Sequence, residues 1–243
     1  MSTDAQATGW TAPAPVHAVC FDLDGTLLDT AADIALALRR AFADRGLQAP
    51  TDDAVRQMIG KGSPTLVARA MAACGVAPDA TVSAALLEGF FHHYGHLHDA
   101  GESTASPYPG VLETLPVLTS AGLALAVVTN KQHRYACDLL DHLGLSRHFD
   151  LVVGGDTCER RKPDPLPLQW ACDRLGVSAS SAVMVGDSIN DVQAARGAGM
   201  RVYCVPYGYN ETEDPRLLHC DGLIDTIAHL PRCIGLAVDV PGF

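Results

Sequence analysis

Two aspartates, Asp22 and Asp24, are the residues of this 243-residue chain whose types and spacing most directly indicate chemistry. They follow the apolar run 16–21, which predicts a buried strand, and residues two apart in an extended chain project to the same side. Gly25 then permits a sharp turn. Carboxylates this close repel each other unless a cation or a shared proton offsets the charge. The pattern suits a Mg²⁺ site with one aspartate as nucleophile and the other as acid/base, although a strand-to-loop turn also fits this motif alone.

Two further polar motifs offer groups that bind phosphate. Thr129 and Asn130 follow the apolar run 123–128, and we expect the Thr129 hydroxyl and the Asn130 backbone N–H to bind phosphoryl oxygens. A helix N-cap is the structural alternative for this pair. Lys162 precedes Pro163, where a predicted helix begins, so it can place a positive charge beside the nucleophile and the phosphate. A solvated basic turn is its alternative.

A second acidic pair, Asp187 and Asp191, follows the apolar run 182–185. Asp187 is expected at the end of the strand and Asp191 in the first turn of the next helix. Hard oxygen ligands are those that Mg²⁺ prefers, so we predict Asp187 as a metal ligand and Asp191 as a partner of metal-bound water or of Lys162. Two aspartates that merely cap a helix are the alternative.

Strand-like apolar runs alternate with helical patterns over most of the chain, which predicts an α/β fold with a parallel sheet and helices on both faces. In such sheets ligands bind beyond the carboxyl ends of the strands, where the polar motifs lie. Strands are predicted at 16–21, 123–128, 149–153, 182–185, 201–205 and 223–224, and helices at 135–143, 163–175 and 190–197.

One long segment breaks this alternation. Between Asp29 and about Ser106 the apolar residues have helical spacing and no strand is evident, which predicts a small helical domain inserted after the first strand. We expect a flexible tail at 1–15, a core formed by 16–30 and 107–243, and a helical cap at 31–106. Gly60, Lys61 and Gly62 are interpreted as a cap loop that closes over a small substrate, with a turn between cap helices as the alternative.

Composition limits the classes of partner. The net charge of -11 disfavours nucleic acid and anionic membrane surfaces, although a metal and a few cations can still attract an anionic substrate into a cleft. The eight cysteines contain no C-x-x-C pair, and we interpret them as reduced thiols of a cytoplasmic protein. The chain shows no secretory signal and no apolar run of membrane-spanning length. The oligomeric state is left open.

The four motifs D-x-D-G-T, T-N, K-P and G-D-x-x-x-D, in this order, resemble those of the haloacid dehalogenase-like hydrolase superfamily. The resemblance extends over the chain from Val16 onward. It implies a Rossmann-like core, an inserted α-helical cap and an obligatory Mg²⁺. It also implies that the Asp24 backbone carbonyl completes a metal site with Asp22 and Asp187. An acid/base aspartate at position 24 favours phosphoester chemistry over dehalogenation.

Within the superfamily the chain resembles the phosphoglycolate phosphatases, which implies hydrolysis of 2-phosphoglycolate through an aspartyl-phosphate on Asp22. The alternatives are a phosphatase for another small phosphoester, such as a sugar-acid phosphate or a nucleotide monophosphate, and a phosphomutase. A non-catalytic binding module is disfavoured because the expected polar residues are all present. The resemblance rests on the segments 22–30, 59–62, 107–111, 128–131, 154–157, 162–168 and 207–210.

Overall fold

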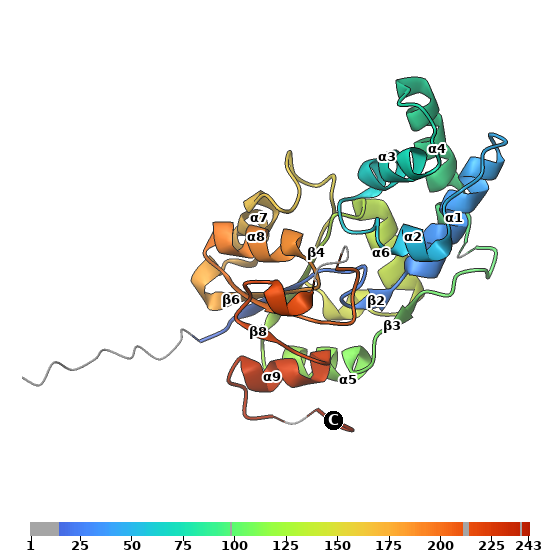
Figure 1. Ribbon diagram of the computed structural model, residues 1–243. Helices are drawn as coiled ribbons and strands as arrows, with labels where there is room; N and C mark the ends of the chain where they lie inside the picture. Colours follow the sequence, from blue (N-terminus) through green and yellow to red (C-terminus); the bar gives the residue numbers. More distant parts are fainter. Residues whose placement is uncertain (1–14, 98, 211–213, 239) are drawn as a thin grey trace, which may run out of the picture.

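A six-stranded parallel sheet forms the centre of the computed structural model, which describes residues 15–97, 99–210, 214–238 and 240–243 (Figure 1). The strand order is β5-β4-β1-β6-β7-β8, and every neighbouring pair is parallel. The α/β prediction is therefore confirmed. The predicted tail 1–15 lies outside the described residues except for Pro15. The strands are β1 (Ala18–Phe21), β4 (Ala124–Val128), β5 (Leu151–Val153), β6 (Ala182–Gly186), β7 (Arg201–Cys204) and β8 (Gly222–Leu223).

Helices cover both faces of this sheet because each strand is apolar on both sides. In β1, Val19 and Phe21 pack toward one face, and Ala18 and Cys20 pack toward the other. The first face is covered by α5 (Val111–Ser120), α6 (His133–His142) and α9 (Leu230–Cys233), and the second by α7 (Leu166–Leu175) and α8 (Ile189–Ala198). Short 3₁₀ segments lie at Ser146–His148, Ala179–Ser181, Pro215–Leu217 and Ile227–His229.

Four helices lie between β1 and α5 in chain order and stand to one side of the sheet (Figure 1). They surround an apolar cluster of their own that includes Phe42, Val67 and Leu86. Tyr209, from the loop after β7, packs into the same cluster and so ties it to the sheet. The assignment of 31–106 as a separate domain stays a prediction. The helices are α1 (Ala31–Ala43), α2 (Asp52–Arg56), α3 (Ser63–Ala73) and α4 (Ala80–His96).

Helices α5 and α9 are absent from the sequence prediction, and two further details differ from it. A small antiparallel pair, β2 (Leu28–Asp29) and β3 (Ser106–Pro107), joins the two chain segments that enter and leave the helical region. Helix α7 begins at Leu166 and not at Pro163, and the Asp164 carboxylate accepts a hydrogen bond from the Leu166 N–H at 2.9 Å, which forms a turn just before the helix.

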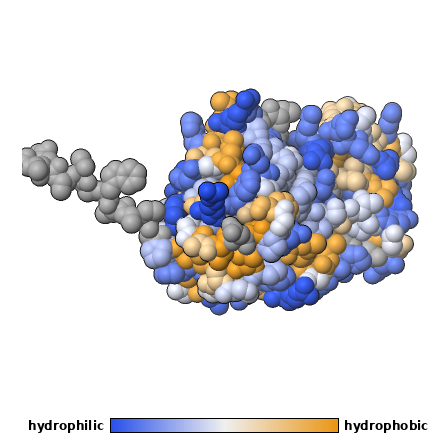
Figure 2. Space-filling view, turned by 90° about the horizontal axis from the view of Figure 1, so that it is seen from below, coloured by the Kyte–Doolittle hydropathy of each residue, from blue (hydrophilic) through white to orange (hydrophobic). Residues whose placement is uncertain are grey.

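No helix in the described part of the chain combines the length and the apolar character that crossing a bilayer requires. Figure 2 shows the side of α5 and α9, where hydrophobic residues gather among hydrophilic ones. All eight cysteines are free thiols. The cytoplasmic location stays a prediction.

Candidate active site

Asp22 lies where β1 ends, at the carboxyl edge of the sheet. Its N–H continues the ladder by donating to the Val185 carbonyl at 2.9 Å. Its buried carboxylate accepts a hydrogen bond from the Leu23 N–H at 2.8 Å and lies 3.0 Å from the Lys162 ammonium. The side chain is therefore held in one orientation by its own loop and by a cation from the segment before α7.

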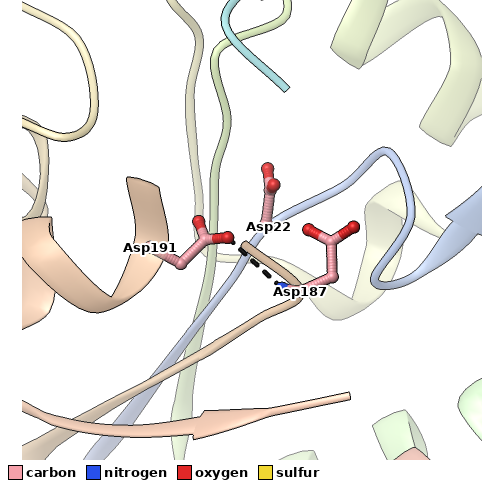
Figure 3. Close-up of side chains that lie close together, drawn as sticks. All are labelled: Asp22, Asp187 and Asp191. Carbon is pink, nitrogen blue, oxygen red and sulfur yellow. Dashed lines mark hydrogen bonds between the residues drawn. The ribbon is translucent and has the colours of Figure 1, made fainter. Parts of the chain in front are cut away.

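Three carboxylates from two strand ends and a helix start meet at this edge (Figure 3). Asp22, Asp187 and Asp191 each offer an oxygen atom within 4.8 Å of the others. Asp187 follows β6, and Asp191 lies in the first turn of α8. The predicted convergence of these three side chains is thus what the topology produces, because β1 and β6 are neighbours in the sheet.

Asp191 is the member of the cluster whose two carboxylate oxygens both accept hydrogen bonds. One oxygen accepts from the Lys162 ammonium at 2.7 Å. The other accepts from the Ser188 hydroxyl at 2.8 Å and from the N–H groups of Ser188 and Asp187 at 3.1 and 3.2 Å. Helix capping, the structural alternative for this motif, is therefore present together with the contact to Lys162. Asp191 orients Lys162 and the Asp187 loop at once.

The electrostatics of the cluster are unfavourable without a further cation. Burial raises the pKa of Asp22 to about 6, and the Asp191 charge adds to this, while Lys162 acts in the opposite direction. Burial and the charges of Asp191 and Asp22 raise the pKa of Asp187 well above its usual range. One ammonium thus does not neutralise three buried carboxylates. A hard divalent cation fits this all-oxygen donor set and would relieve the repulsion.

Asp24 points away from this cluster. Its carboxylate accepts a hydrogen bond from the Thr30 hydroxyl at 2.7 Å and pairs with the Lys131 ammonium at 3.0 and 3.2 Å. The metal role predicted for Asp24 rests on its backbone carbonyl, and that role stays a prediction. Gly25, with φ +88°, makes the turn after it, and a Cβ there would lie 2.3 Å from an Asp187 oxygen.

A cavity lies above these residues, between the sheet edge and the four helices. Thr129 and Asn130 both line it at the end of β4, as the sequence predicted. The remaining lining residues come from β1 and its loop, from the helical region and from the start of α6: Asp22, Asp24, Ile34, Ile59, Gly60, Gly62, Ser63, Leu66, Phe90, Phe91, Tyr94, Lys131 and Tyr135.

Asn130 connects the two halves of the cavity wall. Its side-chain amide donates to the Gly60 carbonyl and to the Lys162 carbonyl, both at 2.9 Å. Gly60 and Gly62 line the cavity, whereas Lys61 is not among its lining residues. The glycine loop therefore rests directly on the carboxyl edge of the sheet, and the backbone of Gly60 and Gly62, more than the Lys61 side chain, faces the cavity.

Lys131 and Tyr94 are two cavity residues that sequence reasoning missed. Both are buried, and the Lys131 ammonium lies 4.5 Å from the centre of the Tyr94 ring. Lys131 directly follows the Thr129-Asn130 pair, so its position was a usable signal, but an extended pattern does not tell which of three residues points into a cavity. Tyr94 has helical apolar spacing, which is equally typical of core residues.

Comparisons with known proteins agree with this geometry. Residues 19–205 match the family model described as haloacid dehalogenase-like hydrolase. The chain is 40% identical over 220 residues to a phosphoglycolate phosphatase of Thiobacillus denitrificans, covering 89% of this chain and 94% of the relative. It is 46% identical over 223 residues to one of Rhodospirillum rubrum, covering 90% of each.

A solved structure shows the same fold. It is described as a predicted phosphoglycolate phosphatase from Haemophilus somnus 129PT and superimposes with a TM-score of 0.84 at 30% identity, covering 90% of this chain and 97% of the other. The sequence motifs, the sheet topology and the acidic cluster all agree with these matches. The chain therefore belongs to the haloacid dehalogenase-like hydrolase family, among its phosphatases.

Proposed function

We propose that this protein is a Mg²⁺-dependent phosphatase that hydrolyses 2-phosphoglycolate to glycolate and phosphate through an aspartyl-phosphate on Asp22. The observation that carries the proposal is the buried trio Asp22, Asp187 and Asp191, which Lys162 joins and of which Asp22 lines a cavity. Small anionic phosphoesters are the substrate class that such a site suits, because a metal and a lysine can together neutralise a phosphoryl group.

The side chains of Asp22 and Asp187, with the Asp24 backbone carbonyl, would hold the metal. Asp191 would act mainly through Lys162, since the contacts above occupy both of its oxygens. Bound Mg²⁺ would neutralise and orient the phosphoryl oxygens. The raised pKa values of Asp22 and Asp187 support this assignment, because a cation would keep both of them ionised at neutral pH.

The chain's own residues divide the work of two steps. In the first, an Asp22 oxygen attacks phosphorus, while Lys162, the Thr129 hydroxyl and the Asn130 backbone N–H bind the phosphoryl oxygens. Asp24, which carries a proton at this stage, gives it to the departing glycolate oxygen. In the second step, Asp24 takes a proton from the attacking water, which releases phosphate and restores the Asp22 carboxylate.

Substrate choice belongs to the cavity wall that the helices supply. Gly60 and Gly62 bring the backbone close to the sheet edge, and Phe90 and Tyr94 narrow the space from α4. A compact leaving group is favoured by such a wall. The identities of 40% and 46% to phosphoglycolate phosphatases support glycolate as that group.

The test is the release of phosphate from a panel of 2-phosphoglycolate, sugar phosphates, sugar-acid phosphates and nucleotide monophosphates, with Mg²⁺ and with a chelator. We expect the largest kcat/KM for 2-phosphoglycolate and no turnover without the metal. A larger value for another phosphoester would replace the substrate and keep the phosphatase chemistry. Conversion of a sugar phosphate to its isomer with little free phosphate would instead indicate a mutase.

A further inference from the structure

Lys131 is a buried cation that the proposed chemistry does not use. Its side chain is 7% exposed, and it pairs with Asp24 at 3.0 Å. Burial lowers the pKa of Lys131, but the contributions of Asp24 and Tyr94 together outweigh burial and raise the pKa above its usual range, so the side chain is an ammonium at neutral pH. Among the described residues that line the cavity, Lys131 is the only lysine or arginine.

Tyr94 adds a second feature that indicates a ligand at the same place. Its hydroxyl is buried and has no hydrogen-bond acceptor in the described part of the structure, where the Lys131 ammonium, which can only donate, is its polar neighbour. Its ring lies against the Lys131 ammonium at 4.5 Å from the centroid, and both residues line the cavity. A buried hydroxyl without a partner is costly, so an acceptor supplied by a bound molecule would stabilise it.

Asp24 does not depend on Lys131 alone. The Thr30 hydroxyl also donates to its carboxylate, at 2.7 Å. Lys131 can therefore exchange one carboxylate partner for another without leaving Asp24 unbonded. Lys162 is committed to Asp22 and Asp191 beneath the cavity, so it serves the phosphoryl end, and Lys131 remains for a second anionic group.

We propose that Lys131 and the Tyr94 hydroxyl bind the carboxylate of the substrate's leaving group, and that this contact draws Lys131 from Asp24 and frees Asp24 to face the ester oxygen. The inference rests on the proposed function and makes it more specific. It assigns the selection of a carboxylate-bearing phosphoester to one cation and one hydroxyl. Phosphoesters without a second anion would leave both groups without their partner.

Two inert ligands test this directly. 3-Phosphonopropionate replaces the ester oxygen of phosphoglycolate by a methylene group, and propylphosphonate has the same chain without the carboxylate. Calorimetric titration with Mg²⁺ present measures both affinities for each variant, so loss of turnover does not affect the result. We expect wild-type protein to bind the carboxylate ligand roughly 10- to 100-fold more tightly, as for a charged hydrogen-bonded contact.

Lys131→Gln retains a donor to Asp24 but removes the charge, and it should reduce this preference to about threefold or less. Tyr94→Phe should reduce it by roughly five- to tenfold, with little effect on folding because the lost hydroxyl has no hydrogen-bond acceptor among the described residues. Arg134→Gln is the matched control, since it removes a cation that is 80% exposed on α6, and it should retain the full preference.

The outcomes separate the two proposals. A wild-type preference that persists in Lys131→Gln overturns the role of Lys131 and leaves phosphoglycolate as substrate. No wild-type preference overturns the phosphoglycolate assignment and the carboxylate site together. If Lys131→Gln does not fold, as judged by its melting curve, an unchanged preference in Tyr94→Phe contradicts the inference.

Discussion

At the scale of single residues, the site depends on how one buried ammonium is shared. The Lys162 side chain is 1% exposed and lies 3.0 Å from Asp22 and 2.7 Å from Asp191. Burial lowers the pKa of Lys162, whereas the carboxylates of Asp191 and Asp22 raise it by more. The pKa is therefore above its usual range, and the side chain is charged at neutral pH. Lys162 thus stabilises the nucleophile before substrate arrives and the phosphoryl charge afterwards.

Lys162→Met tests this shared role. We expect kcat/KM for 2-phosphoglycolate to fall on the order of 10²- to 10³-fold, the typical effect of removing one preorganised donor to transition-state charge. The measurement is steady-state phosphate release. Arg160→Met is the control, because Arg160 is 66% exposed and pairs only with Asp164 among the described contacts, and it should stay near the wild-type rate. Equal losses in both variants would contradict the role given to Lys162.

The sequence predicted the site residues at the strand ends better than the cavity residues Lys131 and Tyr94. Asp22, Thr129 and Asp187 follow strands, and parallel strands bring their carboxyl ends to one edge whatever the details of packing. Lys131 and Tyr94 reach the cavity through side-chain direction and helix placement. These depend on tertiary contacts that spacing in one sequence does not encode.

At the scale of elements, the loop 60–62 packs closely against the end of β4. The Asn130 amide binds the Gly60 carbonyl at 2.9 Å, and a Cβ on Gly62 would lie 3.1 Å from the Asn130 carbonyl oxygen and 3.0 Å from an Arg161 nitrogen. Gly62 has φ +80°, a backbone conformation that favours glycine. The helical region therefore approaches the sheet through backbone, with no room for a side chain.

Gly62→Ala should disturb this contact between the loop 60–62 and the end of β4. We expect a drop in kcat/KM of about tenfold or more, because the wall over the substrate shifts. Gly75→Ala is the control without a close neighbour, since Gly75 has φ +68° and nothing lies within 4 Å of its added Cβ. This control should lose about 1 kcal/mol of stability and keep its activity. Gly62→Ala should lose about 1–3 kcal/mol as well as activity, because φ +80° with ψ 162° is a region that almost only glycine adopts. Similar activities for the two, with melting curves as the folding check, would rule out the close contact as functional.

Element prediction succeeded where a segment was long enough to show a period. The strands at 124–128 and 182–186 and the helix at 189–198 lie within two residues of their predicted bounds. The pair β2 and β3 has two residues in each strand, too few for alternation to appear. Helix α7 starts at Leu166, three residues after the proline signal at 163, because the chain first makes a turn in which the Asp164 carboxylate accepts from the Leu166 N–H.

At the scale of the whole molecule, folding brings the carboxylates of Asp22, Asp187 and Asp191 together, and their mutual repulsion lowers stability. A bound cation should reduce this repulsion. Burial raises the pKa of Asp22 from 3.8 to about 6 in the metal-free chain. A carboxyl whose folded pKa is raised contributes stability below pH 3.8, and this contribution is lost as the pH rises through about 6. Metal-free protein therefore carries a penalty at neutral pH that an uncharged side chain avoids.

With a chelator present at pH 7.5, Asp22→Asn should consequently have a free energy of unfolding about 3 kcal/mol higher than that of wild type. This difference should disappear near pH 4. Urea unfolding at both pH values measures it. Saturating Mg²⁺ should stabilise wild type more than the variant. Asp138→Asn, with a carboxylate 54% exposed, should show none of these effects. Lower stability of metal-free Asp22→Asn at pH 7.5 would show that the cluster is not under repulsion.

The most direct measurement of the central claim is a rapid acid quench of the protein with ³²P-labelled 2-phosphoglycolate and Mg²⁺, followed by peptide mapping. The account predicts label on the peptide that contains Asp22 within the first turnover, the same label in Asp138→Asn, and neither label nor phosphate release in Asp22→Asn. Rapid phosphate release without label on this peptide, or undiminished release from Asp22→Asn, would contradict it.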